Sequence, residues 1–339
     1  MTIAVHTAVL GSGAAALAHT LFQARHGPVV LAGRSEACAP GVERVPAPLL
    51  TLLLELGVVP AELDVDGLTR ARLVAWEDPA PSERFGPACA HLDRRALVEV
   101  LWDRVRDRPE IHVVPPVLRG FEVAFEGEGW AARRLVDATG RRALTATARV
   151  HPVPVWVATC CTVPRGNMDP TMQLAAAPTG YAYRLGSAHW LTVGWVGAGS
   201  PPLDGASLGN RIAREGVGWL ADDVDLRDAR VVRRAASVSI AVGREDRRVV
   251  PIGDAVLGRD ALGSQGAAIG LSDARLAVGP AEGTEVADRH ADGLERHLRH
   301  LAGMLTTCTH HRARPWLVYR RWVEQQRTGR SVRAIASAR

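Results

Sequence analysis

Glycines and alanines follow the first apolar segment of the chain at a regular spacing. Residues 11–16 read GSGAAA, directly after a short apolar run. Gly11 permits a tight turn, Gly13 lets the backbone approach a phosphate, and Ala16 is small enough for a helix to pack closely on a strand. The start of that helix, which includes Ala15, would offer free N–H groups and a positive dipole end. This pattern predicts a dinucleotide-binding turn.

The elements around the turn have the order that such a site needs. We predict a buried strand at Thr7–Leu10, a helix at Leu17–Arg25 and a second buried strand at Val29–Leu31, which together form a βαβ unit. The end of the second strand usually carries an acidic residue for the adenosine ribose, but Arg34 stands near that position. An arginine there could stack on adenine or hold a 2′-phosphate. This half of the chain alone therefore leaves NADP open.

Further polar residues follow two other predicted strands. Leu135–Ala138 leads into Gly140, and Val249–Ile252 leads into Gly253 and Asp254. A loop and the start of a predicted helix then contribute Gly263, Ser264, Gln265, Gly266 and Ala267.

These passages resemble the flavoprotein monooxygenases that have the p-hydroxybenzoate hydroxylase fold. LVDATGR at 135–141 is similar to the DATG strand end of that group, and VPIGDA at 250–255 is similar to its GD motif. Arg94, in a helix predicted at 92–105, matches an arginine that the group places near the ribityl-pyrophosphate. The resemblance implies FAD, with Asp254 accepting hydrogen bonds from the ribityl hydroxyls. The implied FAD-binding residues are Gly11, Gly13, Ala15, Ala16, Arg34, Arg94, Gly140, Gly253, Asp254, Gly263, Ser264, Gln265, Gly266 and Ala267.

Within this group the chain is similar to the tryptophan-halogenase-like branch. It is nearer to the non-halogenating members, which hydroxylate protein-bound tryptophan during quinone-cofactor maturation. The resemblance implies that a halogenase would carry an essential lysine and a Trp-x-Trp-x-Ile-Pro strand. All 41 Lys and Arg residues of this chain are arginines, and YAYRLG stands at the matching positions 181–186. Halogenation is therefore not expected.

The expected activity is FAD-dependent hydroxylation of an electron-rich aromatic ring, an indole or a phenol, through a flavin C4a-hydroperoxide. The substrate could be derived from tryptophan, or be bound to a peptide or a carrier. Tyr181 and Tyr183 share one face of a predicted strand, and His189 begins the next strand, so these three residues are the catalytic candidates. For each of them, structural packing is the competing interpretation.

Two alternative functions stay open on the sequence alone. A dehydrogenase or oxidase that acts on a natural-product intermediate would use the same FAD. A flavin-binding partner protein that lacks turnover would carry the same motifs. We find no second glycine-rich βαβ motif for NADPH in the sequence, so the expected electron source is NAD(P)H bound transiently or a separate flavin reductase.

Composition excludes several other classes of function. The net charge of +5 comes from dispersed arginines without interleaved aromatic residues, so no nucleic-acid partner is expected. Five cysteines without CxxC spacing predict no disulfide frame, and Cys160 and Cys161 are predicted to be buried strand residues. The histidines near the C-terminus lack the carboxylates of known helical metal motifs, so no metal site is expected. Without a signal peptide or an apolar run of about 20 residues, we expect a cytoplasmic protein that does not enter membranes.

The predicted elements indicate an α/β fold with interleaved parts. The 339 residues are enough for two domains. We expect a Rossmann-like FAD-binding domain from residues 1–150 and 245–285, and a β-rich substrate domain with an antiparallel sheet from residues 151–244. Residues 286–339 are expected to form a C-terminal helical segment, with a helical pattern from 293 to 326. This segment resembles a closing helix over the substrate side, although Trp316, Val318, Tyr319 and Trp322 could instead form an oligomer contact.

Overall fold

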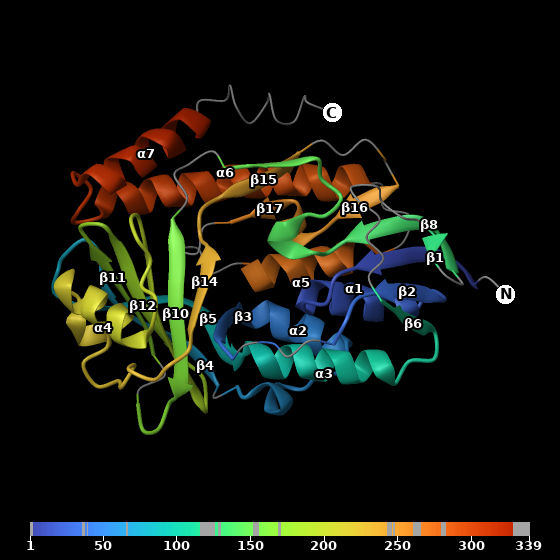
Figure 1. Ribbon diagram of the computed structural model, residues 1–339, viewed down its shortest axis with the longest axis horizontal. Coiled ribbons are helices and arrows are strands. Elements are labelled where there is room, and N and C mark those ends of the chain that lie inside the picture. The colour runs from blue at the N-terminus through green and yellow to red at the C-terminus, as the bar shows by residue number, and fades with distance from the viewer. Residues whose placement is uncertain are drawn as a thin grey trace.

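The computed structural model describes residues 3–35, 38, 40–65, 67–115, 126–127, 130–151, 156–168, 171–242, 246, 248–259, 266–278 and 283–327. The molecule is elongated, with a parallel sheet near the N-terminus at one end and a second, mainly antiparallel sheet at the other (Figure 1). The C-terminal helices run along one side of both sheets (Figure 1). No helix in the described ranges is both long enough and apolar enough to cross a bilayer.

Sheet A, the parallel sheet, has the main strand order β16-β8-β1-β2-β6, and the short β7 (Glu126–Gly127) pairs with β8. Its main strands are β1 (Ile3–Leu10), β2 (Val29–Ala32), β6 (Ile111–Val114), β8 (Trp130–Asp137) and β16 (Val249–Pro251). In the middle of the sheet, Leu10 of β1 pairs with Ala32 of β2 on one side and with Asp137 of β8 on the other. The carboxyl ends of these strands therefore meet at one edge, where open α/β sheets bind their ligands.

Four helices pack together over one face of sheet A in a single apolar core. They are α1 (Ala14–Ala24), α2 (Ala47–Glu55), α3 (Arg94–Arg106) and α5 (Gly266–Leu276). Asp93 caps α3 because its carboxylate accepts a hydrogen bond from the Arg95 N–H at 2.8 Å. Gly13 is the N-cap residue of α1, and no side chain caps this helix. The first N–H groups of α1 are therefore available to a ligand.

Sheet B has the strand order β14-β10-β13-β12-β11-β4-β5-β3. Its strands are β3 (Val42–Pro46), β4 (Leu68–Ala75), β5 (Ser82–Asp93), β10 (Val157–Pro164), β11 (Met172–Ala177), β12 (Gly180–Gly186), β13 (Trp190–Gly197) and β14 (Val231–Ala235). Neighbouring strands are antiparallel, except that β11 and β4 are parallel. Three of the strands come from residues 42–93, so both sheets take strands from the N-terminal part of the chain.

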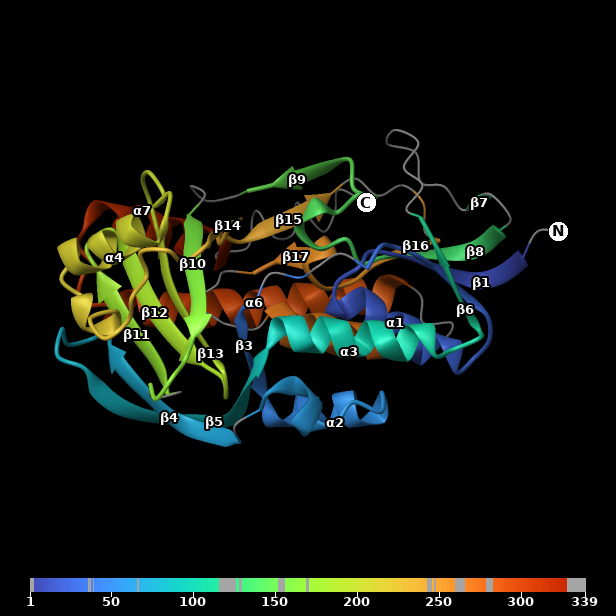
Figure 2. The ribbon, with the colours of Figure 1, turned by 60° about the horizontal axis from the view of Figure 1, so that its bottom comes forward.

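Alternation along the strands gives sheet B two different faces. On one face, Ala182 and Val193 pack with Leu208 and Ile212 of α4 (Gly205–Arg214). On the opposite face, Tyr181 belongs to an apolar cluster shared with the C-terminal helices. A small third sheet, with the order β17-β15-β9, consists of β9 (Ala148–Val150), β15 (Ser239–Val242) and β17 (Leu257–Gly258). Figure 2 shows this sheet on the side of the molecule opposite α2 and α3.

The C-terminal segment forms two helices, α6 (Gly283–Thr307) and α7 (Arg314–Arg327), where the sequence pattern from 293 to 326 predicts one. The chain turns between them because the Thr309 N–H donates to the Trp76 carbonyl oxygen at 2.7 Å, and Pro315 then suits the first turn of α7. Three aromatic residues of α7 are buried within the chain: Trp316, Tyr319 and Trp322. Val318, on the same helix, is 41% exposed.

The α/β class, the Rossmann-like sheet, the interleaved β-sheet and the C-terminal helices are confirmed. One smaller prediction differs from the structure. The strand predicted to begin at His189 begins one residue later, at Trp190. Residues 152–155, 260–265 and 328–339, which include predicted strand, loop and C-terminal positions, lie outside the described ranges.

Candidate active site

The glycine turn after β1 brings the ends of three strands into close contact. Gly11 has a φ of +131°, and a Cβ there would stand 2.5 Å from the carbonyl oxygen of Ala138. A Cβ at Gly33, after β2, would stand 2.5 Å from the carbonyl oxygen of Gly11. Gly13, in contrast, has no atom within 4 Å of its Cβ position. The turn is therefore closed beneath Gly11 and open at the start of α1, where a phosphate would bind.

The other predicted residues of this region take distinct positions. Ala16 is fully buried. The Cβ of Ala15 stands 3.1 Å from the Cβ position of Gly270, so Ala15 contacts α5. Arg34 lies just beyond β2 with an exposed side chain, and its N–H donates to Ser12 Oγ at 3.0 Å. These small contacts hold the turn in place, and Arg34 stands on the surface beside it.

Asp137, at the end of β8, organises the loop that carries Gly140. Its buried carboxylate accepts hydrogen bonds from the Thr139 hydroxyl and the Thr145 hydroxyl, each at 2.6 Å, and from both of their N–H groups. Gly140 follows with a φ of +63° and no atom within 4 Å of its Cβ position. The aspartate of the DATG sequence therefore shapes its own loop, and the loop presents Gly140 to open space.

Asp254 lies in the short 3-10 helix η4 (Gly253–Ala255) that follows β16. Its carboxylate is 3.5 Å from the Arg141 Nε, and Arg149 donates to its backbone carbonyl oxygen. Burial raises the pKa of Asp254, and the nearby Arg141 and Arg149 oppose that effect. Gly253 has a φ of +57° and packs close to Gly270 of α5. The predicted neighbours Gly263, Ser264 and Gln265 lie outside the described ranges.

A cavity of about 610 Å³ joins the edge of sheet A to sheet B. Gly140, Asp254 and Gly266 line it on the side of sheet A. The face of sheet B supplies the opposite wall: Ala158, Cys160, Met172, Leu174, Tyr181, Tyr183 and Leu185. The cavity is thus polar toward the predicted nucleotide site and mainly apolar and aromatic toward sheet B.

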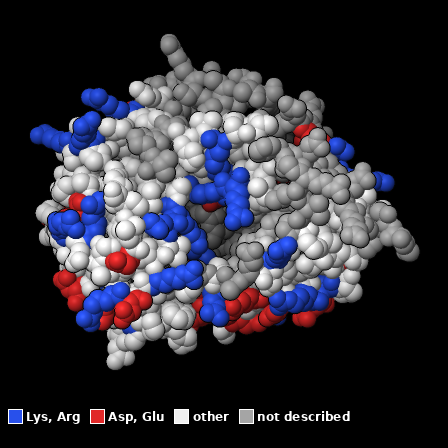
Figure 3. Space-filling model, in the orientation of Figure 1, with Lys and Arg blue, Asp and Glu red and all other residues white. Residues whose placement is uncertain are grey.

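Arginines dominate the charge of this cavity. Among the residues that the structure describes, five arginines and two carboxylates line it: Arg44, Arg94, Arg141, Arg234 and Arg259, with Glu43 and Asp254. Figure 3 shows basic side chains around a hollow in the middle of this face of the molecule. The cavity therefore carries a net positive charge, which suits an anionic cofactor or substrate.

Arg94 reaches the cavity from the first residue of α3. Its side chain forms an ion pair with Glu43 of β3, and its N–H donates to the Gly41 carbonyl oxygen at 2.8 Å. Burial disfavours its charge, but the Glu43 carboxylate raises the pKa of Arg94 above the ordinary value. Arg94 is therefore a fixed cation in the cavity wall.

Tyr183 of β12 crosses the face of sheet B to reach Cys160. It pairs with Gly194 of β13, which in turn pairs with Cys160 of β10, and its hydroxyl interacts with the Cys160 thiol. Burial and the thiol raise the pKa of Tyr183 well above its ordinary value. The phenol is therefore protonated at neutral pH and can donate a hydrogen bond, but it does not serve as a base.

Tyr181 connects the cavity to the C-terminal helices. Its ring centroid lies 6.2 Å from that of Trp76 and 6.4 Å from that of Trp156. Trp156 also stacks on Tyr319 of α7, with centroids 4.9 Å apart. Trp316 of α7 donates from its Nε1 to the Ala177 carbonyl oxygen at 2.7 Å. The C-terminal helices therefore support the aromatic wall of the cavity.

His189 does not reach the cavity. It lies in the turn between β12 and β13, with its side chain 80% exposed and its Nε2 3.3 Å from the Asp64 carboxylate. The same carboxylate accepts a hydrogen bond from the His189 N–H at 3.1 Å. Since β13 begins at Trp190, the alternation of that strand does not apply to His189. We do not assign it a role in the cavity.

Several residues of the cavity wall were not predicted from the sequence. They are Glu43, Arg44, Cys160, Arg234 and Arg259. Only Cys160 had a usable local signal, because strand alternation separates it from Cys161, which is buried on the other face. The others depend on which strands become neighbours.

The residues from the start of α1 to the large cavity fit a flavin dinucleotide. The open start of α1 and the free space at Gly140 suit a pyrophosphate and its neighbours, and Arg94 supplies positive charge. Asp254 places carboxylate oxygens at the cavity, where they could accept hydrogen bonds from ribityl hydroxyls. Within the described ranges, no group of three or more His, Cys, Asp or Glu side chains is arranged to hold a metal ion.

Comparisons with known proteins report on the fold. No protein-family model and no curated protein sequence matches the chain. Among solved structures, the myxobacterial chondrochloren halogenase CndH has a TM-score of 0.72 and 17% identity, over 99% of this chain and 90% of that one. The peptidyl tryptophan dihydroxylase QhpG has a TM-score of 0.60 and 22% identity, over 99% and 79%. A tryptophan halogenase from Shewanella frigidimarina has a TM-score of 0.72 and 12% identity, over 98% and 82%. The chain therefore has the fold of the FAD-dependent halogenases and of the tryptophan dihydroxylase QhpG, as its motifs predicted.

Proposed function

We propose that this protein is an FAD-dependent monooxygenase that hydroxylates an electron-rich aromatic ring, an indole or a phenol. One observation carries the proposal: a single cavity has a glycine-rich, charged wall that fits a flavin and an aromatic wall that fits a ring substrate. The fold supports it, because solved structures with this fold include flavin-dependent halogenases and a peptidyl tryptophan dihydroxylase. The electron source would be a flavin reductase or transiently bound NAD(P)H.

Each wall of the cavity has a task in this reaction. The start of α1, Arg94 and Asp254 would hold FAD, which when bound and reduced supplies the chemistry of oxygen activation. Tyr181 and the apolar residues beside it would hold the substrate ring and exclude water. Tyr183, which is protonated at neutral pH, would donate a hydrogen bond that orients the substrate. An indole ring needs no base for this attack, so the surface position of His189 is compatible with the proposal.

Hydroxylation is favoured over halogenation by the composition of the chain. The resemblance implies that halogenases of this fold use a lysine amine, and all 41 Lys and Arg residues here are arginines. A guanidinium stays protonated at neutral pH and does not replace a reactive amine. We further propose that the ring is part of tryptophan or a related group, free or attached to a peptide or carrier, by analogy with the peptidyl tryptophan dihydroxylase.

The test is a product analysis under reducing conditions. The protein is saturated with FAD, supplied with NADH and a general flavin reductase, and offered indole, tryptophan, phenol and a tryptophan-containing peptide in chloride and bromide buffers. The expected result is a product that contains one oxygen atom from ¹⁸O₂, identified by mass spectrometry. A halogenated product would overturn hydroxylation. Substrate dehydrogenation with hydrogen peroxide release would identify an oxidase, and failure to take up FAD would reject every flavoenzyme function.

A further inference from the structure

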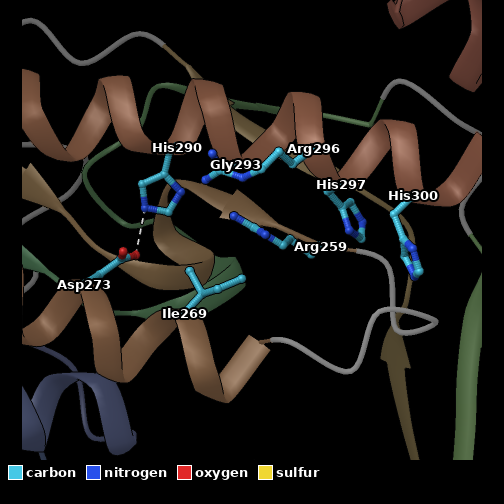
Figure 4. A pocket seen from close by; sticks show the side chains of 8 residues that line it. All are labelled: Arg259, Ile269, Asp273, His290, Gly293, Arg296, His297 and His300. Carbon is cyan, nitrogen blue, oxygen red and sulfur yellow. Dashed lines mark hydrogen bonds and ion pairs between the residues drawn. The ribbon is translucent and has the colours of Figure 1, made fainter. Parts of the chain in front are cut away.

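A second cavity, of about 280 Å³, lies between α5 and α6 (Figure 4). Its lining consists of two arginines, three histidines and three other residues: Arg259, Arg296, His290, His297, His300, Ile269, Asp273 and Gly293. In Figure 4 the side chains of Arg259, His290 and His297 point into the space between the two helices. One water molecule takes about 30 Å³ of liquid, so the cavity has room for a small polyatomic ion together with some water.

Asp273, the carboxylate among the described lining residues of this cavity, is already engaged. Asp273 is buried, and one of its oxygens accepts hydrogen bonds from the Gly253 N–H at 2.9 Å and from His290 Nε2 at 2.7 Å. The aspartate therefore ties α5 and α6 to the turn that carries Asp254. Among the lining residues, the positive charge exceeds the negative charge.

Arg259 is packed tightly against α6. A Cβ at Gly293 would stand 2.6 Å from a terminal nitrogen of the Arg259 guanidinium. Gly293 therefore makes room for this cation between the helices. Arg259 also lines the large cavity, so it stands at the boundary between the two cavities.

His297 carries a buried nitrogen that lacks a partner. The residue is only 3% exposed, and within the described part of the chain its Nε2 has no hydrogen-bond partner. Burial, together with the charges of Arg259 and His300, lowers the pKa of His297 to about 3. The ring is therefore neutral at pH 7, and with hydrogen on Nε2 it would donate into the cavity. A buried donor without an acceptor is costly, so a ligand that accepts a hydrogen bond from this nitrogen would offset that cost.

We propose that the cavity between α5 and α6 binds a tetrahedral oxyanion of the phosphate type, held by Arg259, Arg296 and the His297 Nε2. Two guanidinium groups and a neutral donor suit such an ion, because guanidinium groups bind phosphate oxygens through charge-assisted hydrogen bonds. The proposal concerns a site beyond the proposed FAD site. Since Arg259 also lines the large cavity, a bound anion would change the charge felt there.

The experiment measures phosphate binding by isothermal titration calorimetry, with the purified protein saturated with FAD so that the start of α1 is occupied. The variants are Arg296→Gln and His297→Leu. The matched control is Arg299→Gln, which makes the same charge change on α6 at a residue that is 58% exposed and paired with Glu295 at 2.6 Å. Circular dichroism and melting without phosphate verify that each variant is folded.

The expected result is one phosphate per chain for the wild type and for Arg299→Gln, and binding at least about tenfold weaker for Arg296→Gln and His297→Leu. Competition by NADPH but not by NADH would identify a nucleotide 2′-phosphate as the source, and no competition would identify free phosphate. Absence of binding to the wild type, or equal binding by all four proteins, would overturn the proposal. The comparison among variants locates the site whether or not the protein takes up FAD, so it is independent of the proposed function.

Discussion

The ring of Tyr183 lies over Gly194 of the neighbouring strand, so that a Cβ on Gly194 would stand 2.3 Å from the Tyr183 Cζ. The missing side chain lets the phenol cross β13 and reach Cys160 of β10. The position of this cavity residue is therefore set by a glycine on one neighbouring strand and a thiol on the next. Tyr183 lines the cavity that we propose for the aromatic substrate.

The substitution Gly194→Ala should displace Tyr183. The new methyl group would overlap the ring, so we expect the free energy of unfolding to fall by about 1–3 kcal/mol and kcat/KM for hydroxylation to fall at least about tenfold, because small misplacements at a reacting centre are costly. FAD absorbance should not change. The control is Gly209→Ala on α4, where the new Cβ would have only Leu226 Cδ1 near it, at 3.9 Å. Equal behaviour of the two variants in denaturant unfolding and kinetics would contradict this role of Gly194.

Substitutions at two glycines of the turn should affect FAD binding and protein stability separately. Gly13→Val places a side chain in the open space at the start of α1, so we expect FAD retention to weaken at least about tenfold while the unfolding free energy changes by less than about 1 kcal/mol. Gly11→Ala places a Cβ against the Ala138 carbonyl oxygen at a positive φ, so it should destabilise the protein by about 1–3 kcal/mol. Fluorescence titration with FAD and urea unfolding measure the two effects. Unchanged FAD retention in Gly13→Val would refute the assignment of the turn.

Motifs that depend on spacing along the chain could be predicted from the sequence. The turn at Gly11 follows from glycines spaced directly after a strand, whereas Gly140, Asp254 and Arg94 were expected from the resemblance to the flavoprotein monooxygenases. The structure places Gly140, Asp254 and Arg94 in the lining of one cavity. Alternation alone correctly placed Tyr181 and Tyr183 on one face of β12, although it cannot say what that face contacts.

Contacts between distant segments could not be predicted in this way. Glu43 meets Arg94, and Gly194 lies beneath Tyr183, only because of the strand order of sheet B, which joins residues 42–93 to residues 157–235. Nothing local specifies that order. The break between α6 and α7 has the same origin, since the Thr309 N–H that ends the helical run bonds to Trp76, far away in the sequence. The helical pattern of the sequence continues through this break, so the pattern alone does not locate it.

The docking of α7 should depend on Trp316. Trp316→Phe removes the Nε1–H that donates to the Ala177 carbonyl oxygen and leaves that acceptor unpaired in a buried place. We expect the free energy of unfolding to fall by about 1–3 kcal/mol, measured in urea. Trp219→Phe is the control, because that ring is only half-buried on the α4 side of sheet B and should cost less. Equal losses in the two variants would argue against a specific role for the bond to Ala177.

His19 should make the protein sensitive to acid. It is fully buried in α1, and its Nδ1 donates to the Ala274 carbonyl oxygen of α5 at 2.9 Å. Burial lowers its pKa from 6.5 to about 4. Below pH 6.5 the imidazole of the unfolded chain becomes protonated, whereas the buried imidazole of the folded chain stays neutral until about pH 4. The contribution of His19 to the free energy of unfolding is therefore fully present above pH 6.5 and is lost as the pH falls. Between pH 7 and pH 5 the loss from this residue should be about 2 kcal/mol.

The substitution His19→Asn tests this linkage. The asparagine amide nitrogen takes about the place of the imidazole Nδ1, so the bond to the Ala274 carbonyl oxygen can form, but the group no longer titrates. The difference in unfolding free energy between pH 7 and pH 5, measured in urea, should therefore shrink by about 2 kcal/mol. The exposed His26 provides the control, since His26→Asn should leave the pH dependence of the wild type unchanged. A His19→Asn variant that loses as much stability as the wild type between these two pH values would show that another buried group dominates the acid response.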